Sequence, residues 1–163
     1  GCNVDPATLA RLATLPTVVG VKEASGNMAQ ICEVCHVVPP GFLVLSGDDA
    51  LTLPTMAVGG RGIISVASNE VPGPMARMAE AFERGDLVGA RDLHRRLLPL
   101  MLVNFTESNP IPVKAAMAMM GLLDEYYRLP MVPPRPETRA KLAHILSELA
   151  LLPAPEAGLR IEA

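Results

Sequence analysis

Three short apolar runs, each followed by polar and glycine-rich residues, constrain the fold of this chain more than any other feature. The runs occupy residues 17–22, 42–46 and 62–66. Near-continuous apolar runs of this length are typical of strands in a parallel sheet whose two faces are both covered. A helix is expected to begin at Asp5 and Pro6, before the first run, and to stop at Pro16. Stretches with helical periodicity follow the runs, at 27–38, 50–58 and 72–84. The alternation predicts an α/β fold built from three successive strand–loop–helix units.

The second half of the sequence predicts helices alone. A long helix is expected from Asp86 to about Phe105, bent at Pro99, because proline cannot donate a backbone hydrogen bond inside a helix. Further helices are expected at 109–121 and 137–151, with a proline-rich crossing between them. We therefore predict a strand-containing part at 1–84, a helical extension at 85–152 and a loose tail at 153–163.

Charge and composition argue against several classes of partner. The net charge is −3 and no run of basic residues is present, which argues against a nucleic-acid surface or an anionic membrane as partner. No apolar stretch approaches the roughly 20 residues that span a bilayer. The chain contains three cysteines and no secretory leader pattern at its start, so we expect reduced thiols and a cytoplasmic location.

Three strands cannot close a barrel, and the first would be left as a long apolar edge. The 163-residue sequence also starts with glycine instead of methionine. We therefore expect a piece of a longer protein. The alternative is a half-barrel that persists only by pairing with a complementary chain.

A Cys-x-x-Cys-His sequence at residues 32–36 matches the attachment pattern for c-type haem. It lies inside a predicted amphipathic helix, where Cys35 falls on the apolar stripe with Val34 and Val38. No second cysteine pair and no spaced histidine pair accompanies it, and no carboxylate cluster has metal spacing. We therefore interpret the cysteines as small hydrophobic residues, and we expect neither a metal nor a cofactor.

Lys22 is the candidate nucleophile. It ends the first predicted strand, and the chain holds only three lysines against eleven arginines. Burial lowers the pKa of catalytic lysines from about 10.4 to roughly 7–8, and the neutral amine attacks carbonyl carbons to form a Schiff base. The local sequence alone favours a simpler alternative, a strand-end lysine whose ammonium group lies in water.

The second strand ends in Ser-Gly-Asp-Asp, at residues 46–49. Gly47 would allow the backbone to approach a ligand closely, because glycine carries no side chain. Asp49 is expected to cap the helix that follows. These positions lie at the carboxyl end of a strand, where α/β folds place their sites.

Several segments, taken in order, resemble one family. They are Val-Gly-Val-Lys-Glu-Ala-Ser-Gly-Asn at 19–27, Leu-Ser-Gly-Asp-Asp at 45–49, Gly-Gly-Arg-Gly-Ile-Ile-Ser-Val at 59–66, Asn-Pro-Ile-Pro-Val-Lys at 109–114 and Leu-Pro-Met at 129–131. The chain is similar to the dihydrodipicolinate synthase family over residues 1 to about 152. The family condenses pyruvate with L-aspartate 4-semialdehyde in lysine and diaminopimelate biosynthesis.

The resemblance implies a (β/α)₈ TIM barrel with a C-terminal helical extension, usually assembled as a homotetramer. This chain resembles the last three barrel strands and the extension. By position, Lys22 corresponds to the lysine that forms the Schiff base with pyruvate. Ile64 is similar to the residue whose backbone contacts bound pyruvate, and Gly47 lies near the same pocket.

Part of the family's site has no counterpart in this sequence. The proton-relay tyrosine and the arginine that grips the aldehyde's carboxylate are expected just before residue 1, and Tyr126 and Tyr127 fall in the helical extension instead. Other pyruvate-dependent aldolases share the lysine-bearing barrel, including N-acetylneuraminate lyase and 2-keto-3-deoxygluconate aldolase. They remain the alternative, because the missing half largely sets the aldehyde specificity.

Overall fold

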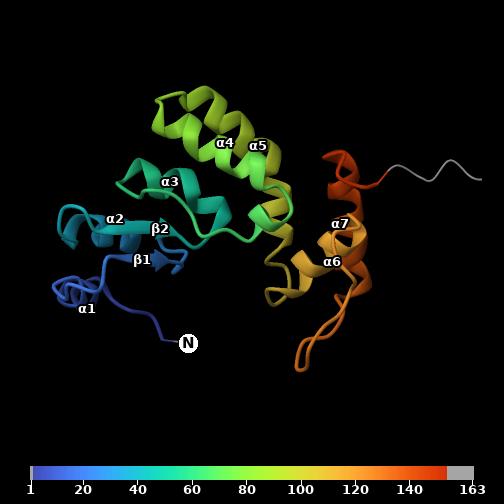
Figure 1. Cartoon of the computed structure of the whole chain (residues 1–163), viewed down its shortest axis with the longest axis horizontal. Helices are drawn as coiled ribbons and strands as arrows, with labels where there is room; N and C mark the ends of the chain where they lie inside the picture. Colours follow the sequence, from blue (N-terminus) through green and yellow to red (C-terminus); the bar gives the residue numbers. More distant parts are fainter. Residues whose placement is uncertain (1, 154–163) are drawn as a thin grey trace, which may run out of the picture. The chain divides into compact units, whose positions relative to one another are not determined.

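The computed structural model describes residues 2–153 (Figure 1). Apart from Pro153, the tail predicted at 153–163 lies outside the described residues. The chain divides into two compact units, one that ends at Leu102 and one that begins at Val103. The boundary predicted after residue 84 falls inside the first unit, between two of its helices.

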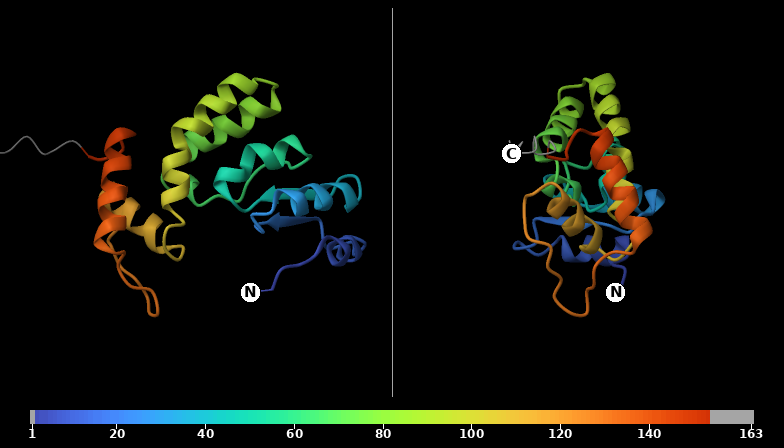
Figure 2. Two further views of the ribbon diagram at one scale, coloured as in Figure 1. Left: turned by 180° about the vertical axis from the view of Figure 1, so that it is seen from behind. Right: turned by 90° about the vertical axis from the view of Figure 1, so that its right-hand side faces the viewer.

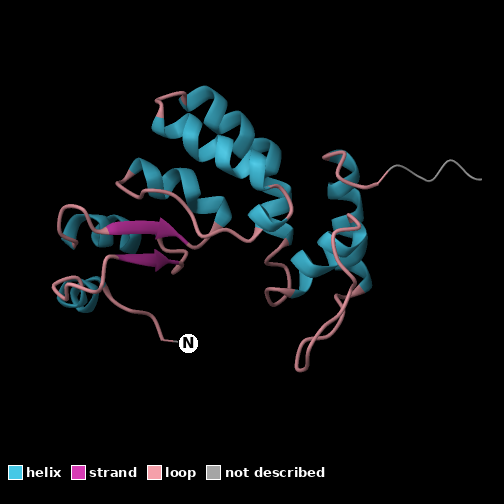
Figure 3. Cartoon of the chain, in the orientation of Figure 1, coloured by secondary structure: helices cyan, strands magenta, loops and turns pink. Residues whose placement is uncertain are grey.

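The first unit mixes helices and strands (Figure 3). In chain order its elements are α1 (Pro6–Leu12), β1 (Gly20–Glu23), α2 (Met28–Val37), β2 (Leu43–Ser46), η1 (Asp49–Leu51), α3 (Thr52–Ala57), η2 (Ala67–Asn69), α4 (Pro72–Glu83) and α5 (Leu87–Val103), which ends at the boundary. The first two predicted strands and the helices predicted between residues 5 and 105 are therefore confirmed, with ends that shift by a few residues. Pro99 lies inside α5, as predicted.

Local chemistry explains where these elements begin. The Asp5 carboxylate accepts a hydrogen bond from the Thr8 backbone N–H at 2.8 Å, and Pro6 occupies the first turn of α1. The Asn27 side chain accepts the Ala29 N–H at 3.0 Å and begins α2. Both side chains satisfy backbone donors that have no partner inside the helix.

The sheet is parallel and consists of β1 and β2, with Lys22 opposite Leu45 and Glu23 opposite Ser46. The third predicted strand, at 62–66, is wrong as a full strand. The Ser46 N–H donates to the Gly62 carbonyl and the Ile64 N–H to the Ser46 carbonyl, each at 2.8 Å, which makes one isolated parallel bridge between Ser46 and Ile63. The pairing stops there because the chain turns into η2 at Ala67.

Helices cover one face of this sheet. Leu9 of α1, Val34 of α2 and Val44 of β2 form a buried cluster, with Val21 of β1 packed against it. The next helices continue the layer, since α2 contacts α3 and α3 contacts α4, as Figures 1 and 2 show from opposite sides. The core of the first unit therefore lies on the helix-covered side of the strands.

The second unit contains α6 (Ile111–Met119) and α7 (Pro136–Glu148), which pack against each other. The segment between them is held by side chains of α7 and of the loop before α6. The Glu125 carboxylate pairs with Arg139, and Glu107 accepts the Arg135 backbone N–H at 3.0 Å. None of the described helices is long and apolar enough to cross a membrane.

Candidate active site

The two faces of the β1–β2 sheet carry different side chains. Successive residues of a strand point to opposite faces, so Val21 and Glu23 face the helices while Lys22 faces the other way. Because Lys22 pairs with Leu45, both side chains share this second face. On β1, Lys22 is exposed, whereas Glu23 is 6% exposed. The sheet therefore has a covered face and an open face, and Lys22 lies on the open one.

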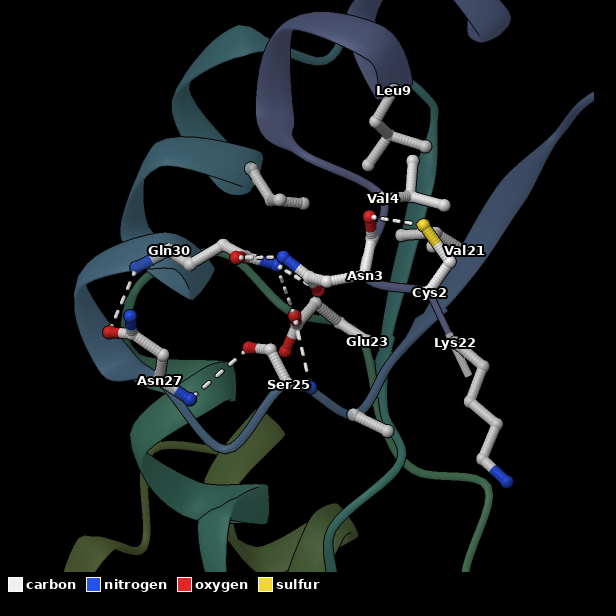
Figure 4. Close-up of a pocket in the computed structure, with 12 residues that line it drawn as sticks. Cys2, Asn3, Val4, Leu9, Val21, Lys22, Glu23, Ser25, Asn27 and Gln30 are labelled. Carbon is white, nitrogen blue, oxygen red and sulfur yellow. Dashed lines mark hydrogen bonds between the residues drawn. The ribbon is translucent and has the colours of Figure 1, made fainter.

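Figure 4 shows the environment of Lys22. Its side chain extends from β1 on the side away from Glu23 and Gln30, so its amine does not join the polar groups of the covered face. No ion pair or hydrogen bond holds the amine among residues 2–153. The structure thus leaves the amine able to meet a carbonyl compound from the open face.

Gly47 lies directly against the Lys22 side chain. A methyl group built on Gly47 would lie 2.9 Å from Cε and 3.0 Å from Cγ of Lys22, and 2.7 Å from Cβ of Ala24. The Gly47 N–H donates to the Glu23 carbonyl at 2.6 Å, which fixes the glycine at the end of both strands. The lack of a side chain at Gly47 is therefore what leaves room for the lysine.

Ile64 borders the same face. Ser46 and Ile63 are partners in a parallel bridge and so share the covered face, and the next residue, Ile64, turns toward the face that carries Leu45. Ile64 is 45% exposed, and its N–H donates to the Ser46 carbonyl. The structure thus brings Lys22, Gly47 and Ile64 to one end of one face.

The covered side holds a polar network that the sequence reasoning did not find. The side-chain amides of Asn3 and Gln30 exchange two hydrogen bonds, at 2.7 and 3.1 Å, and Gln30 also donates to the Glu23 carboxylate at 3.2 Å. A cavity of about 580 Å³ lies beside this network and is lined by Lys22 as well. Strand alternation was the available signal, because it predicts that Glu23 faces the helices, where a carboxylate needs partners.

The role predicted for Asp49 is wrong. Asp48 is the N-cap of η1, where its carboxylate accepts the Ala50 N–H at 2.9 Å. Asp49 is 1% exposed and binds instead to the backbone N–H groups of Val66 and Ala67. The sequence could not distinguish the two neighbouring aspartates because either could accept hydrogen bonds at a helix start.

The cysteine pair lies on α2 as expected, but its two members differ. Cys35 is half-buried against the cluster of Leu9, Val34 and Val44, whereas Cys32 is exposed. Within residues 2–153, no group of three or more histidine, cysteine, aspartate or glutamate side chains is arranged to hold a metal ion.

Comparison with known proteins gives the site its context. Residues 1–149 match the model of the dihydrodipicolinate synthetase family. The chain belongs to this family. A relative from Koribacter versatilis, a 4-hydroxy-tetrahydrodipicolinate synthase, is 56% identical over 150 residues. That match covers 92% of this chain and 50% of the relative. The chain therefore spans about half the length of the curated relatives it matches.

Solved structures of family members are also similar to this chain. The dihydrodipicolinate synthase of Thermotoga maritima has a TM-score of 0.90 and 42% identity, over 92% of this chain and 52% of that one. The Acinetobacter baumannii enzyme in complex with pyruvate has a TM-score of 0.86 and 33% identity, over 91% of this chain and 51% of that one. A synthase variant described as monomeric has a TM-score of 0.88 and 42% identity, over 93% and 52%.

Proposed function

We propose that this chain carries the Schiff-base-forming part of a 4-hydroxy-tetrahydrodipicolinate synthase. Three observations support the proposal: family membership over residues 1–149, the position of Lys22 next to the last residue of β1 on an open sheet face, and the space that Gly47 leaves beside its side chain. The close approach of Gly47 to Lys22 is the strongest of the three, because it is a contact within this chain and does not depend on similarity to other proteins.

The proposed chemistry begins at the Lys22 amine. Nζ attacks the keto carbon of pyruvate, a carbinolamine forms, and loss of water leaves a protonated imine. The imine withdraws electrons from the adjacent methyl group, which loses a proton to give an enamine. The enamine carbon then attacks the aldehyde of L-aspartate 4-semialdehyde, and cyclisation follows. The protein supplies electrostatic stabilisation and proton transfer around a covalent intermediate.

We further propose that the chain corresponds to the last strands of a (β/α)₈ barrel and the helices after them. The first 46 residues contain two β-strands, whereas residues 67–153 contain helices and no strand. A segment from the beginning of such a barrel would keep alternating strands with helices throughout. For the whole protein we propose a cytoplasmic homo-oligomer, a tetramer by family resemblance, which sedimentation analysis would test.

Borohydride trapping tests the central claim. Borohydride reduces an imine to a stable secondary amine, so pyruvate plus borohydride should attach a reduced pyruvyl group to Lys22. Peptide mapping by mass spectrometry provides an internal control, because the two other lysines, Lys114 and Lys141, lie on α6 and α7 of the second unit. Modification of all three lysines to the same extent, or of none, would refute the proposed role of Lys22.

A second candidate rests on the open face itself. Leu43 is 42% exposed and Ile64 45% exposed, on the side of the sheet opposite the buried cluster of Leu9, Val34 and Val44. Exposed apolar surface of this kind favours contact with another chain. The second candidate is therefore an inactive half-barrel that requires a complementary chain. A cooperative melt of a monodisperse monomer would count against it.

Aldehyde specificity separates the synthase from other aldolases that use pyruvate. If trapping succeeds, L-aspartate 4-semialdehyde should discharge the Lys22 enamine faster than N-acetylmannosamine or glyceraldehyde. Preference for either sugar-type aldehyde would favour the sister aldolases instead.

A further inference from the structure

Asp49 joins two segments that are far apart in the sequence. It lies in η1, after β2, and is 1% exposed. Its Oδ2 atom accepts the Val66 N–H at 3.1 Å and the Ala67 N–H at 2.9 Å, across 17 and 18 residues. These donors begin η2, which has no side-chain cap of its own. The Asp49 carboxylate therefore satisfies backbone groups that would otherwise be buried without a partner.

The same stretch of chain holds Ile64 from the other side. The Ser46 carbonyl accepts the Ile64 N–H, and Asp49 binds the N–H groups that follow two and three residues later. The Ser46 hydroxyl in turn donates to the Asp48 carbonyl at 2.7 Å, which fixes the turn that carries Asp49. Ile64 is thus held between two contacts from residues 46–49, the segment that also contains Gly47.

The contacts to Val66 and Ala67 leave one oxygen of the Asp49 carboxylate unused. The second carboxylate oxygen of Asp49, Oδ1, has no hydrogen-bond partner among the described residues, and no lysine or arginine forms an ion pair with the group there. A buried polar atom without a hydrogen-bond partner costs free energy, so stability alone does not explain this oxygen. Residues that break the ordinary rules of burial are concentrated at functional sites.

We propose that Asp49 is a positioning residue for 2-oxo acid binding. It holds the 62–67 turn so that the backbone at Ile64 meets the substrate on the same face as Lys22. The inference rests on the proposed function, because it needs the 2-oxo acid to be bound as an imine at Lys22. Asp49 itself touches neither the amine nor the substrate.

The test compares two modifications of Lys22 in the complete 163-residue chain. Pyruvate with borohydride requires the 2-oxo acid site, whereas formaldehyde with cyanoborohydride alkylates an accessible amine without it. In Asp49→Ala, we expect the pyruvate concentration for half-maximal labelling to rise about tenfold or more, since the two hydrogen bonds that hold the turn after Ile64 are lost. The rate of alkylation by formaldehyde should stay within about twofold of the parent, because the hydrogen bonds lost lie away from the amine.

Two further variants separate positioning from folding. Asp49→Asn keeps an oxygen that can accept the same N–H groups and should recover much of the affinity. Asp48→Ala removes a hydrogen bond of similar length, from the Ala50 N–H to the Asp48 carboxylate, which does not involve residues 62–67. Pyruvate labelling of Lys22 in this variant should match that of the parent. Hydrogen exchange measured at the Val66 and Ala67 amides should speed up in Asp49→Ala and not in Asp48→Ala.

The outcomes are distinguishable. In Asp49→Ala, the pyruvate concentration for half-maximal labelling could stay unchanged although hydrogen exchange at Val66 and Ala67 is faster. That result overturns the positioning role and leaves the proposed function intact. Absence of a pyruvate adduct in the parent, with normal alkylation by formaldehyde, overturns the proposed function and the positioning role together. Loss of the pyruvate adduct in both Asp49→Ala and Asp49→Asn, with loss of the cooperative melt while formaldehyde still alkylates Lys22, shows a purely structural role and also overturns the proposal.

Discussion

The side chains on the two faces of the β1–β2 sheet have different physical explanations. On the covered face, Val21 and Val44 pack under α1 and α2, and the buried Glu23 is held by Gln30. On the open face, Lys22 and Ile64 are exposed, and Gly47 leaves space beside the lysine. Packing explains the first set and leaves the second unexplained. The residues that packing does not explain are those to which the proposed chemistry is assigned.

The largest effect is expected at Lys22. Lys22→Arg keeps a side chain of similar length, but its guanidinium stays protonated and cannot act as an amine nucleophile. Pyruvate-dependent borohydride labelling should therefore fall below detection by mass spectrometry. The melting temperature should change little, because the side chain lies exposed on the open face.

Lys114→Arg is the matched control for this variant. Lys114 lies in α6 with its amine 5.5 Å from the Tyr127 ring centroid, in the other unit of the chain. In Lys114→Arg, pyruvate with borohydride should label Lys22 to the same extent as in the parent. If pyruvate labelling persists in Lys22→Arg, the nucleophile is another residue, and the open face has no role in Schiff-base formation.

Gly47→Ala should give the next largest effect. The added methyl group would clash with the Lys22 side chain and with Ala24. Overpacking of this kind typically costs about 1–3 kcal/mol. We expect slower labelling of Lys22, by about tenfold or more, since displacement of a reacting group by about 1 Å can cost a hundredfold.

Gly73→Ala is a suitable comparison. Gly73 lies in α4, where a methyl group would meet only the end of the flexible Arg77 side chain, at 3.2 Å. In Gly73→Ala, pyruvate should label Lys22 at the rate of the parent, and the variant should be as stable as the parent or slightly more stable. Equal labelling rates in the two glycine variants would show that the room beside Lys22 does not matter.

A pair of adjacent residues tests the covered and open faces directly. Val44 is 2% exposed and faces the helices, whereas its neighbour Leu43 is 42% exposed and faces the other way. Val44→Ala should cost about 1.5–3 kcal/mol of unfolding free energy, and Leu43→Ala less than about 1 kcal/mol, although leucine is larger. Urea unfolding followed by circular dichroism gives both values.

The opposite ranking would be equally informative. If Leu43→Ala costs as much as Val44→Ala, the open face is covered in solution by another copy or a complementary chain. The cost should then depend on protein concentration, because association stabilises by mass action. The measurement thus separates the two candidate functions as well as the two faces.

The sequence predicts the covered face well and the open face incompletely. Apolar periodicity identifies α1, α2, β1 and β2, because their burial follows from alternation and from helical spacing. The apolar run at 62–66 fails as a strand because only Ile63 finds a bridge partner, Ser46, before the chain turns at Ala67. Pairing depends on neighbours that a local pattern does not contain.

The candidate site divides in the same way. Resemblance assigns Lys22, Gly47 and Ile64, and the structure places them together, but their chemical roles stay predictions. Local sequence did not identify the link from Asp49 to Val66 and Ala67, since it crosses 17 and 18 residues. It also missed the pairing of Asn3 with Gln30, which spans 27 residues.

The smallest expected effect concerns the cysteines of α2. Burial on the covered side, with added repulsion from Cys32 and Glu23, raises the pKa of the Cys35 thiol above its ordinary value. Iodoacetamide reacts with the thiolate, so at pH 8 it should modify the exposed Cys32 at least about threefold faster than Cys35. The difference between the two alkylation rates should become smaller as the pH rises through the raised pKa of Cys35.

The same shift has a defined sign for stability. The folded-state pKa lies above that of the unfolded chain, so the contribution of the neutral thiol is fully present below the ordinary cysteine value, near pH 8.5. It is lost as the pH rises through the folded-state value. Cys35→Ala should therefore lose less stability between pH 8 and 10 than the parent, whereas Cys32→Ala, which keeps the half-buried Cys35 thiol and removes only the smaller contribution from repulsion, should stay closer to the parent. A steeper loss in Cys35→Ala would mean that Cys35 does not belong to the packed face.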